Sequence, residues 1–429
     1  MNFEIPPRDY GNKWKLLEPL KKAELINHFV DQIELNQEKF QSIQWEEMSK
    51  PPSLALGELK SAVRFGRFVA NLLSEPLTYE VESITPGKRM LVSRVPYGTM
   101  LAITSFNTPL PNYMWKVAPA LAAGNQVKLK PSPHTQKSAE YFVDLWRLSN
   151  PDFANVLEFI VCSNEETLEM LDNVDGVSFT GSTAVGRLIL QKASERNLPV
   201  IAELGGSNPF LVMKSADVCE AARAAVISSF SNGGQRCAAG TRFYVHFEVY
   251  DSFISAFDRF TREWVAEPMD SSSFAPLCPP ERSSDFWADI EKLQSLATNV
   301  TRFEIPAWAS GVAGSVPPFI FEFDFIPELY SELFAPVALV QKVKSFDEAI
   351  SLANTSEYGL TAAVWSTSDE ECRVAAQEIK AGLLNFNGPT VGAEPTVPFG
   401  GFGASGNGTR ETGRECILQY STSRVVTWV

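Results

Sequence analysis

Residues 101–130, LAITSFNTPLPNYMWKVAPALAAGNQVKLK, decide the fold class of this chain. A short apolar run, LAITSF, is followed by NYMWKVAPALAAG, where apolar residues recur at helical spacing, and then by a second short run, NQVKLK. The same alternation continues through SAEYFVDLWRL, VLEFIV and GVSFTG. Strands that alternate with helices are typical of βαβ units. The chain is therefore predicted to be an α/β protein, with a parallel sheet covered by helices.

The segments on either side of this region have their own patterns. Residues 16–50 and 54–73 predict amphipathic helices. Residues 78–100 alternate apolar and polar side chains around Pro86 and Gly87, which predicts a β-hairpin. After residue 237, the runs TRFYVHF and VYDSFISAFDRFTREWV predict a second α/β region. Residues 267–319, rich in Ser, Pro and Trp, predict a loop-rich insertion with one helix near residues 286–296.

The composition limits the function classes. The 429 residues are 45% hydrophobic and 21% charged, as expected of a globular protein with more than one core. The net charge of −14 disfavours general affinity for nucleic acid or an anionic membrane. A secretory leader and a long apolar run are both absent, so we expect a cytoplasmic protein. Six cysteines without CxxC pairs and three dispersed histidines predict neither a disulfide framework nor a metal site.

The stretch FTGSTAVG, residues 179–186, places Gly181 and Gly186 between an apolar strand and a helix. Glycines at such a junction let a phosphate approach the positive end of the helix. They can equally serve the geometry of the turn alone, and both interpretations stay open at this point. The dinucleotide-binding pattern G-x-G-x-x-G is absent.

Two further segments carry candidate catalytic side chains. In IAELGGSNPFLV, Glu203 ends an apolar strand, where burial would raise its pKa towards that of a general base; a solvent-facing glutamate is the alternative. In SSFSNGGQRCAAGTR, small residues around Cys237 leave room for a substrate, and backbone N–H groups could bind an oxyanion. Arg236 could stabilise a thiolate. A buried, inert cysteine is the alternative interpretation of Cys237.

The order of the motifs resembles that of the aldehyde dehydrogenase superfamily. The matching segments extend over nearly the whole chain, and the 34-residue separation of Glu203 and Cys237 is also the usual one in the family. They are ITSFNTPL, VKLKPSP, FTGSTAVG, ELGGSNP, NGGQRC, ELFAPV and PFGGFGASGNG. The resemblance implies a Rossmann-like cofactor-binding domain, an α/β catalytic domain and a small β oligomerisation element.

The resemblance also implies the chemistry: oxidation of an aldehyde by NAD or NADP through a thioester. Cys237 would be the nucleophile, Asn107 would stabilise the oxyanion together with the Cys237 N–H, and Glu203 would activate the hydrolytic water. A carboxylate at Glu203 favours hydrolysis over transfer of the acyl group to coenzyme A. A coenzyme A-acylating enzyme and a catalytically silent structural relative stay open as alternatives.

The family resemblance further implies which residues contact the cofactor and the substrate. Relatives that prefer NAD usually carry a glutamate where this chain has Pro133, so a slight preference for NADP, or dual use, is expected. Phe106 replaces a usual tryptophan and Ala335 a usual glycine. The implied cofactor-binding residues are Lys130, Ser132, Gly181, Ser182, Gly186, Glu332 and Phe334.

The substrate pocket implied by the resemblance looks wide and polar. Thr108 stands where relatives acting on simple aldehydes often have a large apolar residue. Arg236 is shared with branches that oxidise anionic semialdehydes, but it could instead be tied to backbone carbonyls in a structural role. The implied pocket residues are Thr108, Asn112, Trp115, Arg236 and Phe399.

The predicted domain boundaries follow from the same resemblance. Residues 1–77 and 97–203 form the cofactor-binding domain, and residues 204–410 form the catalytic domain. Residues 78–96 and 411–429 form the oligomerisation element, so a homodimer or homotetramer is expected. The chain is shorter than most relatives at its start and around residues 267–319.

Overall fold

The first of three principal sheets is parallel throughout, as the alternation in residues 101–130 predicts. The computed structural model describes residues 13–327 and 332–429. The strand order of this sheet is β5-β4-β3-β6-β7. Its elements are β3 (Thr99–Ile103), α4 (Pro109–Ala123), β4 (Gln126–Lys130), α5 (Gln136–Ser149), β5 (Leu157–Phe159), α6 (Asn164–Met170), β6 (Gly176–Thr180), α7 (Thr183–Ser194) and β7 (Val200–Glu203).

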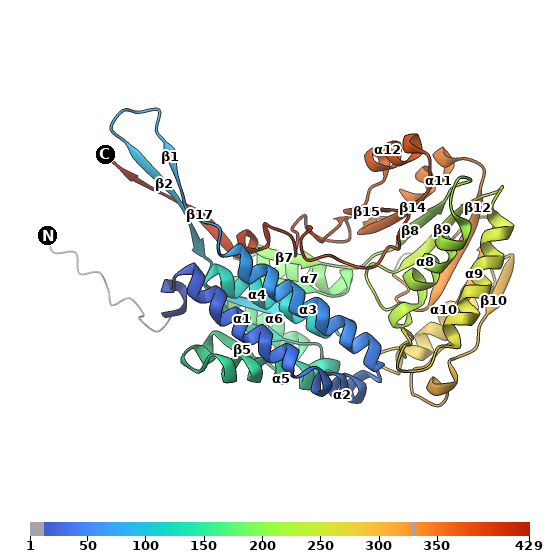
Figure 1. Ribbon diagram of the computed structural model, residues 1–429, viewed down its shortest axis with the longest axis horizontal. Coiled ribbons are helices and arrows are strands. Elements are labelled where there is room, and N and C mark those ends of the chain that lie inside the picture. The colour runs from blue at the N-terminus through green and yellow to red at the C-terminus, as the bar shows by residue number, and fades with distance from the viewer. Residues whose placement is uncertain (1–12, 328–331) are drawn as a thin grey trace.

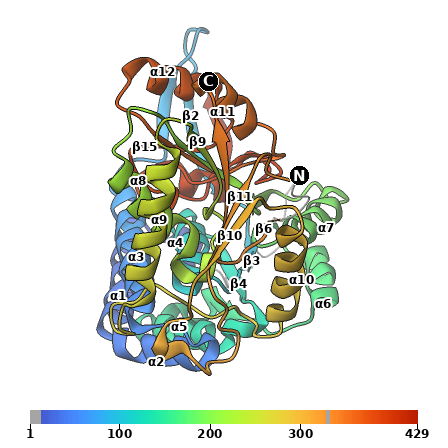
Figure 2. The ribbon, with the colours of Figure 1, turned by 90° about the vertical axis from the view of Figure 1, so that its right-hand side faces the viewer.

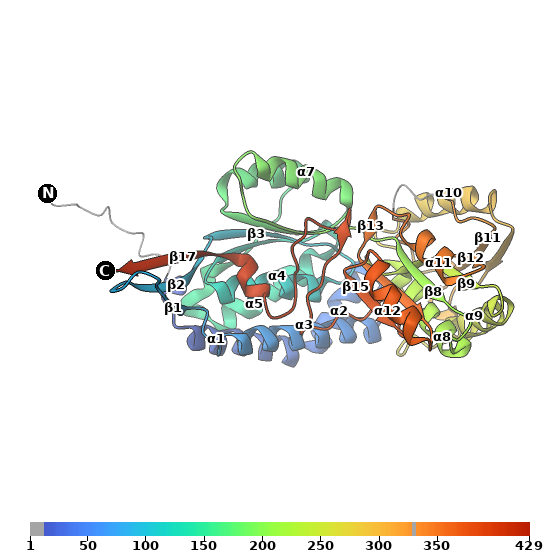
Figure 3. The same cartoon turned by 90° about the horizontal axis from the view of Figure 1, so that it is seen from above.

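Helices cover both faces of this sheet. The predicted amphipathic helices are α1 (Pro19–Leu35), α2 (Gln37–Met48) and α3 (Pro52–Leu72). Seen from above, α7 lies on one side of the sheet, and α1 and α3 lie on the other (Figure 3). Aromatic rings fill the core between the helices: Phe29 packs edge-on against Phe142, with ring centroids 4.8 Å apart. Burial of such apolar faces, rather than helix propensity, supplies most of the stability of these helices.

A second sheet lies beside the first along the long axis of the molecule (Figure 1). Its order is β10-β11-β12-β9-β8-β14-β15, and only the β10–β11 pair is antiparallel. Helices α8 and α9 lie on one side of it, and α10 lies on the other (Figure 2). The strands are β8 (Asn208–Val212), β9 (Gly240–His246), β10 (Asn299–Arg302), β11 (Phe319–Phe323), β12 (Val337–Val343), β14 (Thr361–Trp365) and β15 (Leu383–Phe386). The helices are α8 (Val218–Phe230), α9 (Tyr250–Val265), α10 (Arg282–Gln294), α11 (Phe346–Ala353) and α12 (Asp369–Glu378).

Residues 267–319 are more ordered than the sequence predicts. The single predicted helix is α10, which begins at Arg282 rather than near residue 286. The prediction also missed β10, a four-residue edge strand whose side chains are at least partly exposed. Such a strand has no buried face, so the alternation of apolar and polar residues that reveals strands is absent from its sequence.

The predicted hairpin belongs to a third, smaller sheet. Strands β1 (Tyr79–Glu82) and β2 (Arg89–Pro96) pair, and β17 (Ser421–Trp428) adds to β2 antiparallel along its whole length. This ribbon projects from the end of the molecule far from the second sheet (Figure 1). The hairpin ends at residue 96, because β3 begins at residue 99 and enters the first sheet. The predicted domain boundaries stay a prediction.

One late segment crosses between the two large sheets. Strand β16 (Phe402–Gly403) pairs with β13 (Tyr358–Gly359), while the nearby Leu204 N–H donates to the Ser405 carbonyl over 2.9 Å. The glycine-rich residues 398–408 therefore contact both β13 and the residue that follows β7.

Candidate active site

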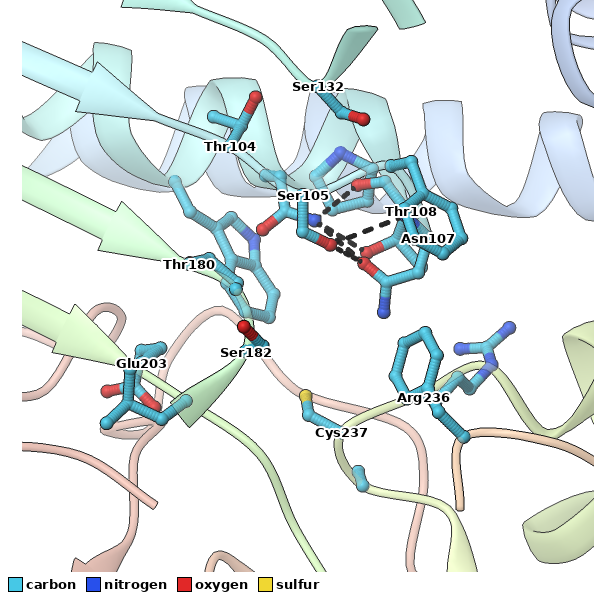
Figure 4. Close-up of a pocket in the computed structure, with 18 of the residues that line it drawn as sticks. Thr104, Ser105, Asn107, Thr108, Ser132, Thr180, Ser182, Glu203, Arg236 and Cys237 are labelled. Carbon is cyan, nitrogen blue, oxygen red and sulfur yellow. Dashed lines mark hydrogen bonds between the residues drawn. The ribbon is translucent and has the colours of Figure 1, made fainter. Parts of the chain in front are cut away.

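A cavity of about 840 Å³ opens where the two large sheets meet. Strands β3 and β6 are neighbours in the first sheet, but the chain leaves them in opposite directions, and ligands bind at such switch points beyond the carboxyl ends of the strands. The cavity lies at these ends (Figure 4). Of the predicted site residues, the ones in its wall are Asn107, Thr108, Asn112, Trp115, Lys130, Ser132, Gly181, Ser182, Glu203, Arg236, Cys237, Glu332, Phe334 and Phe399.

Asn107 lies in the loop between β3 and α4, and only the oxygen of its side-chain amide is hydrogen-bonded by described residues. The amide oxygen accepts hydrogen bonds from Ser105 Oγ at 2.5 Å and from Asn112 Nδ2 at 3.3 Å. An amide whose oxygen is engaged in this way has its two N–H donors on the opposite side. In Figure 4 this nitrogen points towards the side of the cavity where Cys237 lies.

Cys237 follows a loop whose backbone is left-handed at three successive residues, Asn232, Gly233 and Gly234. A Cβ at Gly234 would lie 2.1 Å from the Ala335 carbonyl oxygen, so only glycine fits there. The Cys237 carbonyl accepts a hydrogen bond from Asn208 Nδ2 at 2.7 Å. The loop therefore holds the cysteine at the cavity wall with little freedom.

The thiol of Cys237 is surrounded by carboxyl groups. Burial raises its pKa, and the negative charges of Glu332 and Glu203 raise the pKa further. In the protein alone, the thiol form therefore dominates at neutral pH. Burial lowers the pKa of Arg236, whereas the negative charge of Cys237 raises it, and the role of Arg236 as a thiolate-stabilising neighbour stays a prediction.

Glu203 ends β7 and is buried, so the alternative of a solvent-facing glutamate is wrong. Neither of its carboxyl oxygens has a hydrogen-bond partner among the described residues. Burial raises its pKa well above the ordinary value, and the charge of Glu411 raises it further. A Cβ at Gly400 would lie 2.6 Å from a Glu203 oxygen, so the glycine-rich segment makes room for this side chain.

Sequence reasoning missed a buried ion pair beside Glu203. Lys116 on α4 pairs with Glu411 and donates to Thr180 Oγ1 at 2.7 Å. The charge of Lys116 lowers the pKa of Glu203 and so opposes the effect of Glu411. The available signal was that Lys116 is the one charged residue in the apolar run NYMWKVAPALAAG.

One end of the cavity has groups suited to a nucleotide. Lys130 at the end of β4 is buried, burial lowers its pKa, and its ammonium bonds to no other described residue. Ser182 caps α7 by accepting a bond from the Val185 N–H at 3.4 Å, and this helix N-terminus carries partial positive charge. Both features suit a ligand with hydroxyl and phosphate oxygens.

The two glycines of the 179–186 stretch differ in their surroundings. Gly181 lies in the cavity wall, and a Cβ there would meet the Phe179 ring at 2.6 Å. Gly186 lies outside the wall, and a Cβ there would lie 2.2 Å from a Leu204 methyl carbon. The structure thus places Gly186 in helix-to-strand packing, whereas the sequence predicts it in the cofactor site.

Glu332 lies in the same wall, with one oxygen accepting a bond from the Gly206 N–H at 3.2 Å. Burial raises its pKa to about 8. A Cβ at Gly206 would lie 2.1 Å from the Cys237 carbonyl oxygen, which explains why this residue is glycine. Arg282 lies near Glu332 and its guanidinium stacks over the Phe334 ring, 5.5 Å from the centroid.

Aromatic and arginine side chains also line the cavity. Trp115 and Phe399 pack together with ring centroids 5.1 Å apart. Arg236 also lines the cavity, and its Nε is buried without a hydrogen-bond partner in the described part of the chain. The structural interpretation requires hydrogen bonds from Arg236 to backbone carbonyls, and its Nε makes none within the described residues. Arg64 on α3, which sequence reasoning missed, also lines the cavity.

Comparison with known proteins identifies the family. The model of the aldehyde dehydrogenase family matches residues 8–426. The chain is 31% identical to aldehyde dehydrogenase [NAD(P)+] 1 of Saccharomyces cerevisiae, covering 97% of this chain and 85% of the relative. It is 30% identical to the NADP/NAD-dependent aldehyde dehydrogenase PuuC of Escherichia coli, covering 97% and 84%. An NAD-dependent aldehyde dehydrogenase of Sinorhizobium meliloti superposes with a TM-score of 0.90 at 26% identity, covering 98% and 84%.

The chain therefore belongs to the aldehyde dehydrogenase family. It is an NAD(P)-dependent enzyme of that family, and the resemblance and the α/β fold class predicted from the sequence are confirmed. Within residues 13–327 and 332–429, no helix is long and apolar enough to span a membrane. The described residues also include no cluster of three or more potential metal ligands.

Proposed function

We propose that this enzyme oxidises its aldehyde to the carboxylic acid by a hydrolytic thioester mechanism. The observation that carries the proposal is that Asn107, Glu203 and Cys237 share one cavity with groups that suit a nucleotide. The thiolate form of Cys237 adds to the aldehyde carbon, and the oxyanion so formed accepts hydrogen bonds from Asn107 Nδ2 and the Cys237 N–H. NAD(P) supplies the hydride acceptor and, in its oxidised form, a positive charge.

The remaining steps release the product. Loss of hydride from the tetrahedral carbon leaves a thioester on Cys237. Glu203 then takes a proton from a water molecule whose oxygen adds to the thioester carbon, and the C–S bond breaks to return the thiolate and release the acid. The raised pKa of Glu203 suits a base that must be reprotonated and deprotonated in each turnover.

The residues present fit the cofactor. Lys130 lines the cavity with an ammonium that bonds to no described residue, and ribose hydroxyl oxygens would accept from it. Glu332 lines the cavity and accepts from one N–H donor among the described residues, and a second ribose would donate to its other oxygen. The α7 N-terminus at Ser182 lies in the same cavity wall and would face the phosphates.

The test of this proposal is aldehyde-dependent reduction of NAD or NADP, followed by the ultraviolet absorbance of the reduced cofactor. We expect turnover without coenzyme A, and no gain in rate when coenzyme A is added. A rate that depends on coenzyme A would favour the acylating alternative. Absence of reduction with every aldehyde and both cofactors would favour the silent structural relative.

Replacing Pro133 with glutamate is expected to shift the cofactor preference towards NAD. Pro133 follows Lys130 by three residues and lines the cavity, so a carboxylate there would repel a 2′-phosphate. We expect the ratio of kcat/KM for NADP over NAD to fall by about tenfold or more, which corresponds to about 1.4 kcal/mol. Pro133→Gln, which lacks the charge, is the control. An unchanged ratio of kcat/KM in Pro133→Glu would contradict a role of residue 133 in the choice between NADP and NAD.

We further propose that the substrate is a semialdehyde with an anionic group, because Arg236 lines the cavity and its buried Nε has no hydrogen-bond partner among the described residues. Hydrogen bonds to charged groups contribute about 1.5–3 kcal/mol, so Arg236→Gln should lower kcat/KM for a carboxylate-bearing aldehyde about 10- to 100-fold. The rate with the methyl ester of the same aldehyde should change little. Arg67→Gln is the control, since Arg67 pairs with Asp31 and Glu34 away from the cavity. Equal losses for acid and ester would contradict this proposal.

We also propose assembly into a homodimer or homotetramer. The β1-β2-β17 ribbon carries exposed apolar side chains at Ile84, Val425 and Trp428. Covering such side chains and the free edges of the ribbon by another copy would stabilise the assembly. The cytoplasmic localisation stays a prediction of the sequence.

A further inference from the structure

The backbone carbonyl of Asn107 accepts hydrogen bonds from two side chains that are distant in sequence. Lys50 Nζ donates to it at 2.6 Å, and Asn232 Nδ2 donates at 3.0 Å. Asn107 precedes Thr108, the N-cap residue of α4, so the Asn107 carbonyl lies outside the hydrogen-bond ladder of the helix. These two side chains therefore hold a backbone group that the helix leaves free.

The two donors come from different parts of the site. Lys50 lies between α2 and α3, and Asn232 belongs to the left-handed loop that carries Cys237. The Asn107 carbonyl thus joins the start of α3, the nucleophile loop and the oxyanion asparagine at one point.

Lys50 is also half of a buried ion pair. Its ammonium lies 2.5 Å from a Glu58 oxygen, and the side chains of both residues are almost wholly buried. Burying two charges is costly, and apolar residues of similar volume often stabilise a fold as well or better. The Lys50–Glu58 ion pair is therefore weak evidence that these residues stabilise the fold. The hydrogen bond from Lys50 to Asn107 indicates a different role, in the site.

We propose that Lys50 is a positioning residue that acts through Asn107. Its ammonium fixes the Asn107 backbone, Ser105 and Asn112 fix the amide oxygen, and the Asn107 N–H groups are then directed to the oxyanion next to Cys237. Asn232 sets the separation of that amide from the nucleophile loop. Glu58 neutralises Lys50 and keeps it in place. This inference rests on the proposed function, because it assigns Asn107 to the oxyanion.

The size of the effect follows from geometry. Removing one oxyanion donor outright typically costs 10²- to 10³-fold in rate, and a displacement of about 1 Å costs about 10²-fold. Loss of Lys50 leaves Asn232 in place, so we expect a loss of about 10- to 100-fold in the step that forms the oxyanion.

The test uses two reactions of Cys237 that need no cofactor. Thiolate attack on 4-nitrophenyl acetate forms a tetrahedral oxyanion before 4-nitrophenolate leaves, whereas alkylation by iodoacetamide displaces iodide and forms no oxyanion. The variant is Lys50→Met with Glu58→Gln, which removes both members of the ion pair, and Glu58→Gln alone is its reference. We expect ester acylation to slow about 10- to 100-fold relative to the reference while alkylation stays within about twofold.

Two further variants guard against a general loss of structure. Asn232→Gly removes the second donor, and glycine accepts the left-handed backbone at that position, so it should reproduce the selective loss. Leu59→Ala removes a buried core side chain from α3 and should lower the Tm without changing ester acylation. Equal losses in acylation and alkylation, or no loss in acylation, would overturn the inference.

Asn107→Ala separates this inference from the proposed function. If Lys50 acts through Asn107, adding the Lys50 and Glu58 changes to Asn107→Ala should slow acylation by less than about twofold. Unchanged acylation in Asn107→Ala would instead contradict the proposed oxyanion site itself. Slow acylation in Asn107→Ala, with normal acylation in the Lys50 variant, would overturn only the inference about Lys50.

Discussion

Cys237→Ala is expected to lower aldehyde oxidation by on the order of 10⁴- to 10⁶-fold in kcat, because every later step proceeds from the bond between its sulfur and the substrate. Alanine leaves the loop geometry intact, since the left-handed residues precede position 237. The measurement is the steady-state rate of cofactor reduction with a saturating aldehyde. Binding of the cofactor, followed by fluorescence titration, should change little.

Cys219→Ala is the matched control for this prediction. Cys219 is an exposed cysteine on α8, and the cavity wall does not include it. Its replacement should leave kcat within about twofold, as expected of a surface substitution. Substantial steady-state activity in Cys237→Ala would contradict the mechanism.

The pH dependence of Cys237 gives an independent measurement. Burial and the charges of Glu332 and Glu203 raise the thiol pKa, so the protonated form dominates up to alkaline pH. The thiolate is the nucleophile, and its fraction rises about tenfold per pH unit while the pH lies below the pKa. Alkylation of the cofactor-free protein by iodoacetamide should therefore accelerate steadily between pH 7 and pH 9, a range covering roughly two units of that rise. A plateau within that range would contradict the raised pKa.

Local pattern was sufficient for much of the fold. The alternation in residues 101–130 predicts β3, α4 and β4 because each element buries one face, and burial imposes a period on the sequence. The turn residues Pro86 and Gly87 likewise mark the hairpin. The edge strand β10 escaped prediction because it has no buried face, and hence no period.

The candidate site residues were predicted because their motifs follow one another in a recognisable order along the chain. The prediction missed side chains whose partners are distant in sequence. Lys116 and Glu411 are 295 residues apart, and Lys50 and Asn107 are 57 apart. No local pattern relates the members of such pairs, because only the tertiary fold brings them together. Gly186 shows the converse: its position beside a strand suggested phosphate contact, but the neighbouring Leu204 methyl accounts for it.

Glu203→Gln is expected to release one equivalent of reduced cofactor per active site in a rapid burst and then to turn over about 10²- to 10⁴-fold more slowly. The amide cannot take a proton from water, so the thioester forms at a near-normal rate but persists. Stopped-flow absorbance measures the burst, and mass spectrometry of the quenched protein should detect the acyl group on Cys237. Glu195→Gln, at an exposed position at the end of α7, should show neither effect.

The same substitution should change stability with a sign that is set by the pKa of Glu203. Burial raises that pKa in the folded protein, so between pH 4.5 and the folded pKa the folded state binds a proton that the unfolded state has lost. The stability contribution of Glu203 is therefore present below pH 4.5 and is lost as the pH rises through the folded pKa. Glutamine has no charge to bury, so the Tm of Glu203→Gln relative to the native enzyme should increase with pH, measured by calorimetry. A difference in Tm that shrinks with rising pH would contradict a buried, unpaired Glu203, whereas a growing difference together with the burst would place the catalytic base at a site that stability alone disfavours.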